Sequence, residues 1–253
     1  MDRPRVLVLG GVDPSGGAGV TLDARVLELH GCHAAPVVTC LTVQNRFGCT
    51  EVRGVDTEHL AAALAAALAD GRMHAVKLGL FADAASLTHA AELLADLQLP
   101  IVVDPVLSMT AGGYRAATEM EHAYRDVVAR LHPILTPNLP ELTRLSPGGA
   151  DELLAAGCTA VIVKDGHGDG ADVVDRVCQP HRATALRHPR AVCGPVHGTG
   201  CAFGSALAAG LAHGRNLMAA ATAATWWVGE SLAAMGAPVD AYPRPFVPLP
   251  LAR

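Results

Sequence analysis

The chain has 253 residues, of which 51% are hydrophobic and 17% charged, and its net charge is -5 at neutral pH. This length suits one large α/β core, and a negative chain without a basic run excludes nucleic acid as an expected partner. No stretch approaches the roughly 20 apolar residues that span a bilayer, so no membrane partner is expected, and the N-terminal residues do not resemble a secretory signal.

The seven cysteines are odd in number, and no two of them form a CxxC pair. In a chain of this size this pattern is typical of reduced thiols, so we expect a cytoplasmic protein. The twelve histidines show no metal-ligand spacing with the cysteines, and a zinc site is not expected.

Short apolar runs alternate with segments of helical spacing along the whole chain. The predicted strands lie at residues 6–9, 35–42, 51–55, 75–78, 101–103, 134–136, 160–163, 172–177 and 183–187, the last two as an antiparallel pair. The predicted helices lie at residues 18–30, 57–68, 84–97, 119–131, 139–145, 151–156, 199–213 and 217–235, with Thr57 as the expected cap of the second. This alternation predicts a mostly parallel sheet with helices on both faces. Without a shift in composition, we expect residues 1–253 to form a single domain.

Unusual polar segments follow the first two strands, where an open α/β sheet binds its ligands. Residues 10–19 form a loop with five glycines that matches neither the dinucleotide fingerprint nor a Walker A motif. It is either a flexible turn or a ligand-binding loop, and the helix after it carries Asp23. Gln44 and Asn45 follow the next strand, either as a turn or as amides that recognise a heterocycle.

Charged side chains follow three later strands. Asp104 directly follows the 101–103 run, either as a turn cap or as a metal or hydrogen-bond ligand. Either Asn138 or Leu139 caps the helix that begins near Pro140, and Glu141 either binds Mg²⁺ through water or favours the helix dipole. Lys164 places a cation just past the 160–163 strand.

The most informative segment is HGTGC at residues 197–201, which runs into a helix of small apolar residues. A helix N-terminus carries unpaired N–H groups and partial positive charge, so it binds phosphate and lowers the pKa of a thiol. The segment is either an anion cradle with Cys201 as a candidate base, or a glycine turn with Cys201 as a core residue.

These segments together resemble the hydroxymethylpyrimidine/phosphomethylpyrimidine kinases of thiamine biosynthesis, within the ribokinase-like superfamily. The matching segments appear in order between residues 6 and 230. They are the GxDPSGGAG loop with Asp23, TVQN at 42–45, DPV at 104–106, TPNLPE at 136–141, VKDGH at 163–167 and HGTGC at 197–201.

The resemblance implies a ribokinase-like three-layer sandwich and a cytoplasmic homodimer that uses ATP and Mg²⁺. Its small-molecule substrate would be 4-amino-5-hydroxymethyl-2-methylpyrimidine and then the monophosphate of that alcohol. By position, the pyrimidine pocket would comprise Gly11, Ala18, Asp23 and Gln44. The nucleotide would be bound by Lys164, Asn138, Thr199 and Gly200, and Mg²⁺ by Asp104 and Glu141. Catalysis would depend on Lys164 and on the N–H groups of Gly198 and Gly200, with Cys201 in the base position.

The chain departs from the family pattern in three places. The lid after DPV lacks its usual lysine and reads SMTAGG at residues 108–113. Asp165 replaces a glycine and adds negative charge near the nucleotide, and the C-terminal residues 244–248 read RPFVP instead of a His-Gly-rich ending. The segment 169–190 is short and rich in His and Arg, so the nucleotide base would be held differently.

Three alternative functions remain open from the residues alone. A pyridoxal or pyridoxine kinase would share the fold and the cradle. The missing lid lysine would fit a non-catalytic pyrimidine- or nucleotide-binding regulator. A Cys-His hydrolase using Cys201 and His197 is disfavoured, because no third residue is placed to orient that pair.

Overall fold

A computed structural model of the chain describes residues 3–109, 112–166, 170–238 and 240–251. Its strands are β1 (Arg5–Val12), β2 (His33–Asn45), β3 (Gly48–Gly54), β4 (Ala75–Leu78), β5 (Ile101–Val103), β6 (Ile134–Leu135), β7 (Ala160–Val163), β8 (Asp172–Gln179), β9 (Arg182–Pro189), β10 (Val196–His197) and β11 (Arg244–Pro245). Its helices are α1 (Gly19–Leu29), α2 (Thr57–Ala69), α3 (Ala84–Leu94), α4 (Thr118–Leu131), α5 (Leu139–Leu145), α6 (Ala150–Ala155), α7 (Thr199–Ala212) and α8 (Leu217–Ala234).

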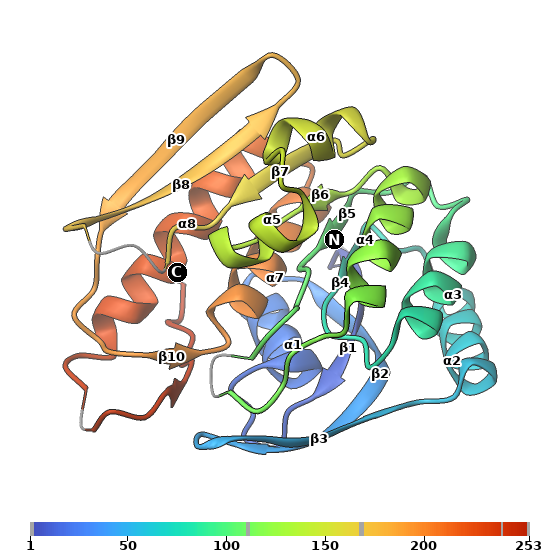
Figure 1. Cartoon of the computed structure of the whole chain (residues 1–253), viewed down its shortest axis with the longest axis horizontal. Helices are drawn as coiled ribbons and strands as arrows, with labels where there is room; N and C mark the ends of the chain where they lie inside the picture. Colours follow the sequence, from blue (N-terminus) through green and yellow to red (C-terminus); the bar gives the residue numbers. More distant parts are fainter. Residues whose placement is uncertain (1–2, 110–111, 167–169, 239, 252–253) are drawn as a thin grey trace.

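The central sheet has the order β3-β2-β1-β4-β5-β6-β7-β8-β9 in the described part of the chain. The six central strands β2, β1, β4, β5, β6 and β7 pair in parallel. Strand β3 at one edge and strands β8 and β9 at the other are antiparallel additions. In Figure 1 the β8–β9 hairpin projects beyond the rest of the sheet. The predicted mostly parallel sheet is confirmed, and its order brings the carboxyl ends of β1, β4, β5, β6 and β7 to one edge.

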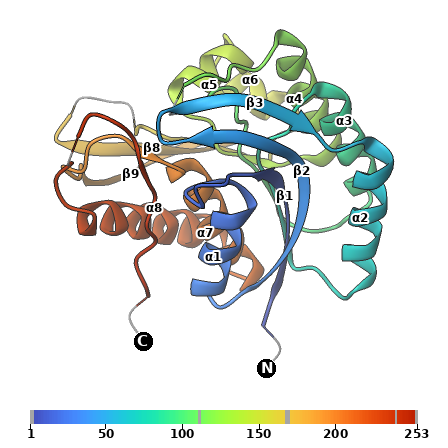
Figure 2. The same cartoon turned by 90° about the horizontal axis from the view of Figure 1, so that it is seen from below.

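Helices cover both faces of this sheet, which gives the predicted three layers (Figure 2). Leu7 and Leu9 of β1 pack into the core beneath α2–α6, and Val6 and Val8 pack beneath α1, α7 and α8. This alternation of side chains along each strand explains why the parallel strands are apolar on both faces. None of the described helices is both long and apolar enough to cross a membrane.

Small residues let α7 approach its neighbours closely. A Cβ atom on Gly210 would lie 2.9 Å from the Cβ of Ala220, and one on Gly204 would lie 3.5 Å from Cε of Lys77. The alanine- and glycine-rich sequence of α7 therefore lets its C-terminal end approach α8 and its N-terminal half approach β4.

The structure corrects several predicted boundaries. Gln44 and Asn45 do not follow β2 but belong to it, because β2 continues along β3 and Gln44 pairs with Cys49. The cap of α2 is Asp56, whose side chain accepts a hydrogen bond from the His59 N–H, and not Thr57. The short pair β10–β11 was not predicted, because two-residue strands carry no periodic signal.

Candidate active site

A cavity of about 750 Å³ opens at the carboxyl edge of the sheet. All twelve predicted site residues line it: Gly11, Ala18, Asp23, Gln44, Asp104, Asn138, Glu141, Lys164, Gly198, Thr199, Gly200 and Cys201. The fold therefore gathers segments from the whole chain into one place, as expected for the carboxyl ends of parallel strands. His167 of the VKDGH segment, and Thr110 and Ala111 of the SMTAGG segment, lie outside the described residues.

The glycine loop (residues 13–18) turns sharply between β1 and α1. Gly19 has a φ of +62°, and a Cβ atom there would lie 2.2 Å from the carbonyl oxygen of Gly11. A side chain at Gly11 would in turn lie 2.8 Å from Sγ of Cys40. Glycine is therefore required at both ends of the loop, and the turn leaves Ala18 at the cavity wall.

Asp23 is part of a fully buried ion pair that was not predicted from the sequence. Its Oδ2 accepts a hydrogen bond from Nζ of Lys77 at 2.8 Å, and its Oδ1 accepts one from Oγ of Ser205 at 2.8 Å. Burial alone would lower the pKa of Lys77, but the Asp23 carboxylate outweighs it and raises that pKa above its usual value. Removing one partner of such a buried pair costs about 3–5 kcal/mol. Asp23 thus stabilises this wall of the pocket through Lys77 and Ser205.

Gln44 lies on β2 and lines the same cavity. Its Oε1 atom is buried and finds no hydrogen-bond partner among the described residues. A buried amide oxygen without a partner costs free energy unless a ligand supplies a donor. The Gln44 amide is therefore available for a ligand that carries a donor group.

Asp104 and Lys164 form a second ion pair in the middle of the cavity. Nζ of Lys164 donates to Oδ1 of Asp104 at 2.8 Å, and Oγ1 of Thr136 lies 3.4 Å from the same oxygen. Burial would lower the pKa of Lys164, but Asp104 and Glu141 raise it above its usual value. Gly200 provides the space for this pair, since a Cβ there would lie 3.1 Å from both Lys164 Nζ and Asp104 Oδ2.

Asn138 and Glu141 form a capping box at the start of α5. The Glu141 N–H donates to Oδ1 of Asn138 at 2.8 Å, and the Asn138 N–H donates to Oε2 of Glu141 at 2.9 Å. Burial raises the pKa of Glu141 to about 7, although Lys164 acts in the opposite direction. The hydrogen bonds of the capping box therefore fix the Glu141 carboxyl group in the cavity wall, where it can change its protonation state near neutral pH.

These two carboxylates fit the chemistry of Mg²⁺. Magnesium is held in proteins by one or two carboxylates, with its remaining positions filled by water and substrate phosphates. Asp104 and Glu141 provide two such oxygen ligands beside Lys164. Within the described residues no group of three or more His, Cys, Asp or Glu side chains could hold an ion alone, so phosphate oxygens would complete the coordination.

The cradle (residues 198–201) forms the first turn of α7. Gly198 is the N-cap with a φ of +98°, and the cap has no side-chain hydrogen bond. The N–H groups that open the helix therefore face the cavity without a capping side chain and are available to an anion. This geometry agrees with the anion-binding interpretation of HGTGC.

The expectation that the helix start lowers the pKa of the Cys201 thiol is wrong. Burial raises that pKa to about 11, although the Lys77 ammonium acts in the opposite direction. Desolvation outweighs the Lys77 ammonium and the backbone hydrogen bond at Gly19, because α7 packs against both α1 and β4. Cys201 in the resting protein is thus a neutral thiol.

The opposite end of the cavity, which we call the β8–α8 end, was largely missed by the sequence analysis. It is lined by Val173, Asp175, His188, Thr225, Val228 and Leu232. Asp175 accepts hydrogen bonds from the Asp165 N–H at 3.0 Å and from Oγ1 of Thr225 at 3.1 Å. Isolated apolar residues and long-range side-chain bonds form no motif, so only the fold brings them together.

The predicted extra charge of Asp165 is offset within the protein. Arg190 lies 3.8 Å from the Asp165 carboxylate and donates to the backbone oxygens of Asp165, Gly166 and Gly170. Arg190 also lines the cavity. Arg190, which directly follows β9, therefore offsets the negative charge that Asp165 adds to the family pattern.

Comparison with known proteins identifies the relatives of this chain. The family model described as phosphomethylpyrimidine kinase matches residues 13–242. A hydroxymethylpyrimidine/phosphomethylpyrimidine kinase of Streptomyces coelicolor is 32% identical over 241 residues, covering 91% of this chain and 89% of that protein.

Solved structures agree with this assignment of the fold. A Bacillus subtilis pyridoxal kinase in complex with ADP superposes with a TM-score of 0.84 at 25% identity, covering 92% of both chains. A phosphomethylpyrimidine kinase from Clostridium difficile 630 superposes with a TM-score of 0.76 at 25% identity, covering 91% of this chain and 100% of that one. The predicted ribokinase-like sandwich is confirmed.

Proposed function

The chain belongs to the phosphomethylpyrimidine kinase family and is a kinase, and we propose that it phosphorylates 4-amino-5-hydroxymethyl-2-methylpyrimidine and then the resulting monophosphate. ATP is the phosphoryl donor. The observation that carries this proposal is the continuity of one cavity from the unpaired Gln44 amide to Lys164 and the cradle. An aminopyrimidine has both a ring nitrogen and an exocyclic amine, which match the donor and acceptor of one side-chain amide.

We assign the two ends of the cavity to the two substrates. The acceptor end comprises Gly11, Ala18 and Gln44, with Asp23 supporting the wall behind them. The nucleotide phosphates lie at Lys164 and the cradle with Asn138 nearby, and the base extends toward the β8–α8 end. With the two substrates bound in this orientation, the acceptor hydroxyl and the terminal phosphate of ATP would lie side by side at the start of α7.

Phosphoryl transfer depends mainly on positioning and on neutralising charge. Lys164 contributes an ammonium group, and the N–H groups of Gly198, Thr199 and Gly200 donate to the transferred phosphate. Asp104 and Glu141 would hold Mg²⁺, which supplies further charge neutralisation at the phosphates when bound.

Cys201 occupies the base position beside the acceptor hydroxyl. The proton leaves the hydroxyl as the new oxygen–phosphorus bond forms, and a thiolate at Cys201 accepts it. Because the thiol pKa is about 11, only the small ionised fraction can act in this way. Lys77, which lowers the pKa of this thiol, is the cation that would stabilise the thiolate.

Pyridoxal is the second candidate acceptor, because the superposition on the Bacillus subtilis enzyme is close. An assay that couples ADP release to a detectable signal separates the candidates, with the pyrimidine alcohol, its monophosphate and pyridoxal as acceptors. We expect the highest kcat/KM with the pyrimidine alcohol and measurable turnover with the monophosphate. Faster turnover with pyridoxal would overturn the assignment, and ADP release independent of all three would overturn it as well.

We further propose that one kinase domain spans the chain and that the protein is a cytoplasmic homodimer. The seven free thiols support a reducing compartment. Leu41 and Val43 are each more than half exposed on the outer face of β2, beside the oppositely charged Glu51 and Arg53 of β3. Such a face suits a second copy of the same surface. Light scattering should give a dimer mass that Val43→Lys lowers, and a wild-type monomer at all concentrations would exclude the dimer.

A further inference from the structure

His197 joins the two loops between which phosphoryl transfer would take place. We propose that His197 is a positioning residue, whose hydrogen bond to Asp13 holds the cradle against the glycine loop. This inference rests on the proposed function, because it assigns the acceptor to one loop and the phosphate to the other. It assigns His197 no contact with either substrate.

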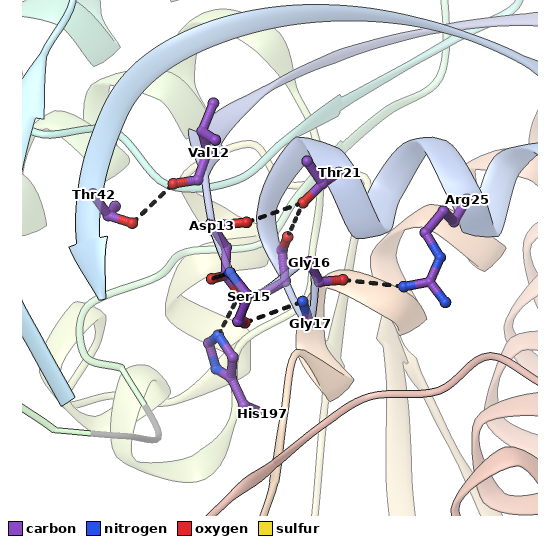
Figure 3. Close-up of polar contacts among 10 residues, drawn as sticks. Val12, Asp13, Ser15, Gly16, Gly17, Thr21, Arg25, Thr42 and His197 are labelled. Carbon is purple, nitrogen blue, oxygen red and sulfur yellow. Dashed lines mark hydrogen bonds and ion pairs between the residues drawn. The ribbon is translucent and has the colours of Figure 1, made fainter. Parts of the chain in front are cut away.

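The bond has an ordinary length, and its acceptor is shielded from water. Nε2 of His197 lies 3.0 Å from Oδ2 of Asp13, which is almost fully buried (Figure 3). Burial would raise the pKa of Asp13, but the hydrogen bonds from His197 and Ser15 lower it below its usual value. Asp13 is therefore a carboxylate at neutral pH and can only accept hydrogen bonds, so Nε2 of His197 is the donor.

Asp13 also organises the glycine loop around itself. Its Oδ1 accepts from the Ser15 N–H and its Oδ2 from Oγ of Ser15, both at 2.8 Å (Figure 3). Its backbone oxygen accepts from the Gly16 N–H at 3.0 Å. A single carboxylate thus defines the loop conformation and offers one further acceptor position, which His197 occupies.

The backbone of His197 is held from the opposite side. β10 pairs with β11, and the Phe246 N–H donates to the His197 carbonyl oxygen at 2.9 Å. Pro245 packs so closely on the glycine loop that a Cβ at Gly17 would lie 2.5 Å from the Pro245 Cβ. The C-terminal segment therefore fixes the backbone, and Asp13 fixes the side chain.

Gly198, which follows His197, links the position of His197 to that of the cradle. A Cβ at Gly198 would lie 1.8 Å from the carbonyl oxygen of Gly17, so the two loops touch through their backbones. Loss of the His197–Asp13 bond would let the cradle shift relative to the glycine loop. A misplacement of about 1 Å between reacting groups can lower turnover about 100-fold.

Two substitutions at His197 test the proposal with a matched control. His197→Leu removes the donor, whereas His197→Gln retains an N–H group near the position of Nε2. We expect His197→Leu to lower kcat about 10- to 100-fold with the Kd for ATP within about twofold, and His197→Gln to recover most of the loss. His89→Gln, in a half-exposed pair with Glu92 outside the cavity lining, should behave as wild type.

Two further measurements separate positioning from folding and from substrate contact. Thermal unfolding reports whether each variant folds, and the ratio of ADP released to acceptor phosphorylated reports alignment, which should rise above one for His197→Leu. In an Asp13→Asn background, His197→Leu should add little to the loss. A loss of ATP affinity that matches the loss of turnover, an unchanged kcat, or full additivity with Asp13→Asn would each overturn the proposal. Failure of the wild type to phosphorylate the pyrimidine would instead overturn the proposed function.

Discussion

The acceptor end and the β8–α8 end of the cavity are built on different physical principles. The acceptor end is fixed by buried polar contacts, in which Lys77, Asp23 and Ser205 form one network and Asp13 and His197 another. The β8–α8 end instead has the apolar side chains of Val173, Val228 and Leu232 as half of its lining, beside His188 and the Asp175–Thr225 bond. Buried polar networks tolerate little change, whereas apolar walls can be repacked.

This difference suggests a division of roles. A network of charged and hydrogen-bonded groups places reacting atoms to within a fraction of an ångström, which phosphoryl transfer requires. An apolar wall binds the flat nucleotide base by burying its apolar surface. This interaction is not directional, so the base can shift slightly without losing much binding free energy. Substitutions in and next to the polar part should therefore affect turnover strongly, and those at the β8–α8 end should affect nucleotide affinity weakly.

The largest effect is expected at Lys164, where the two regions meet. Lys164→Ala removes the ammonium that faces the phosphates and leaves the buried Asp104 without its partner. We expect turnover to fall by about 10²- to 10³-fold, measured at saturating ATP. Lys164→Arg should restore only part of it, because a planar guanidinium does not replace a compact ammonium. Wild-type turnover by Lys164→Ala would remove this residue from the mechanism.

Cys201 provides the next test, because its catalytic and structural interpretations differ most. If it is the base, Cys201→Ala should lower turnover by about 100-fold with substrate binding preserved, and Cys201→Asp should recover part of the rate. If it is only a core residue, Cys201→Ala should lower stability modestly and leave the rate near normal.

The pH dependence of alkylation measures the state of this thiol directly. Because its pKa is about 11 and the thiolate is the reactive form, labelling of Cys201 by iodoacetamide should rise about tenfold per pH unit from pH 7 to 10. ATP and the pyrimidine together should protect it. Rapid labelling at pH 7 that does not depend on pH would show an ionised resting thiol.

The sequence predicted much of the acceptor end and little of the other, for a physical reason. Gly19 and Gly198 are needed because backbones touch there, and Gly11 is needed because Sγ of Cys40 lies against it, so these glycines form local motifs. The Arg190–Asp165 contact joins distant segments, and nothing in either segment indicates the partner. Likewise, the pKa of Cys201 depends on packing around α7 and could not follow from its neighbours in sequence.

Lys77 is a residue that the sequence analysis could have found. It is the charged member of β4, an otherwise apolar strand of four buried residues. A lysine is almost never fully buried unless it is paired. A charge within an apolar strand therefore predicts a buried carboxylate nearby, here Asp23, although not which of the carboxylates of the chain it is.

Gln44 tests whether the acceptor end recognises the acceptor as well as positioning it. Gln44→Leu keeps a similar volume and removes both the donor and the acceptor of the amide. Leaving the ligand groups unpaired costs roughly 1–3 kcal/mol, so the KM for the pyrimidine should rise by about 5- to 150-fold with the KM for ATP unchanged. Equal KM values in variant and wild type would place Gln44 outside the pocket.

The smallest effect on turnover is expected at Thr225, inside the β8–α8 end. Thr225→Val keeps the shape of the side chain and removes the hydrogen bond to Asp175, which also holds the Asp165 N–H after β7. The unpaired carboxylate oxygen should lower the free energy of unfolding by roughly 1–3 kcal/mol, measured by urea denaturation. The KM for ATP should rise only a few-fold and kcat should stay near wild type, because the apolar wall still binds the base. Thr143→Val, on the exposed surface of α5, is the matched control and should change stability by less than about 0.5 kcal/mol. A loss of kcat in Thr225→Val as large as that of Cys201→Ala would mean that this end also positions the reacting groups, and the contrast between the two ends would no longer hold.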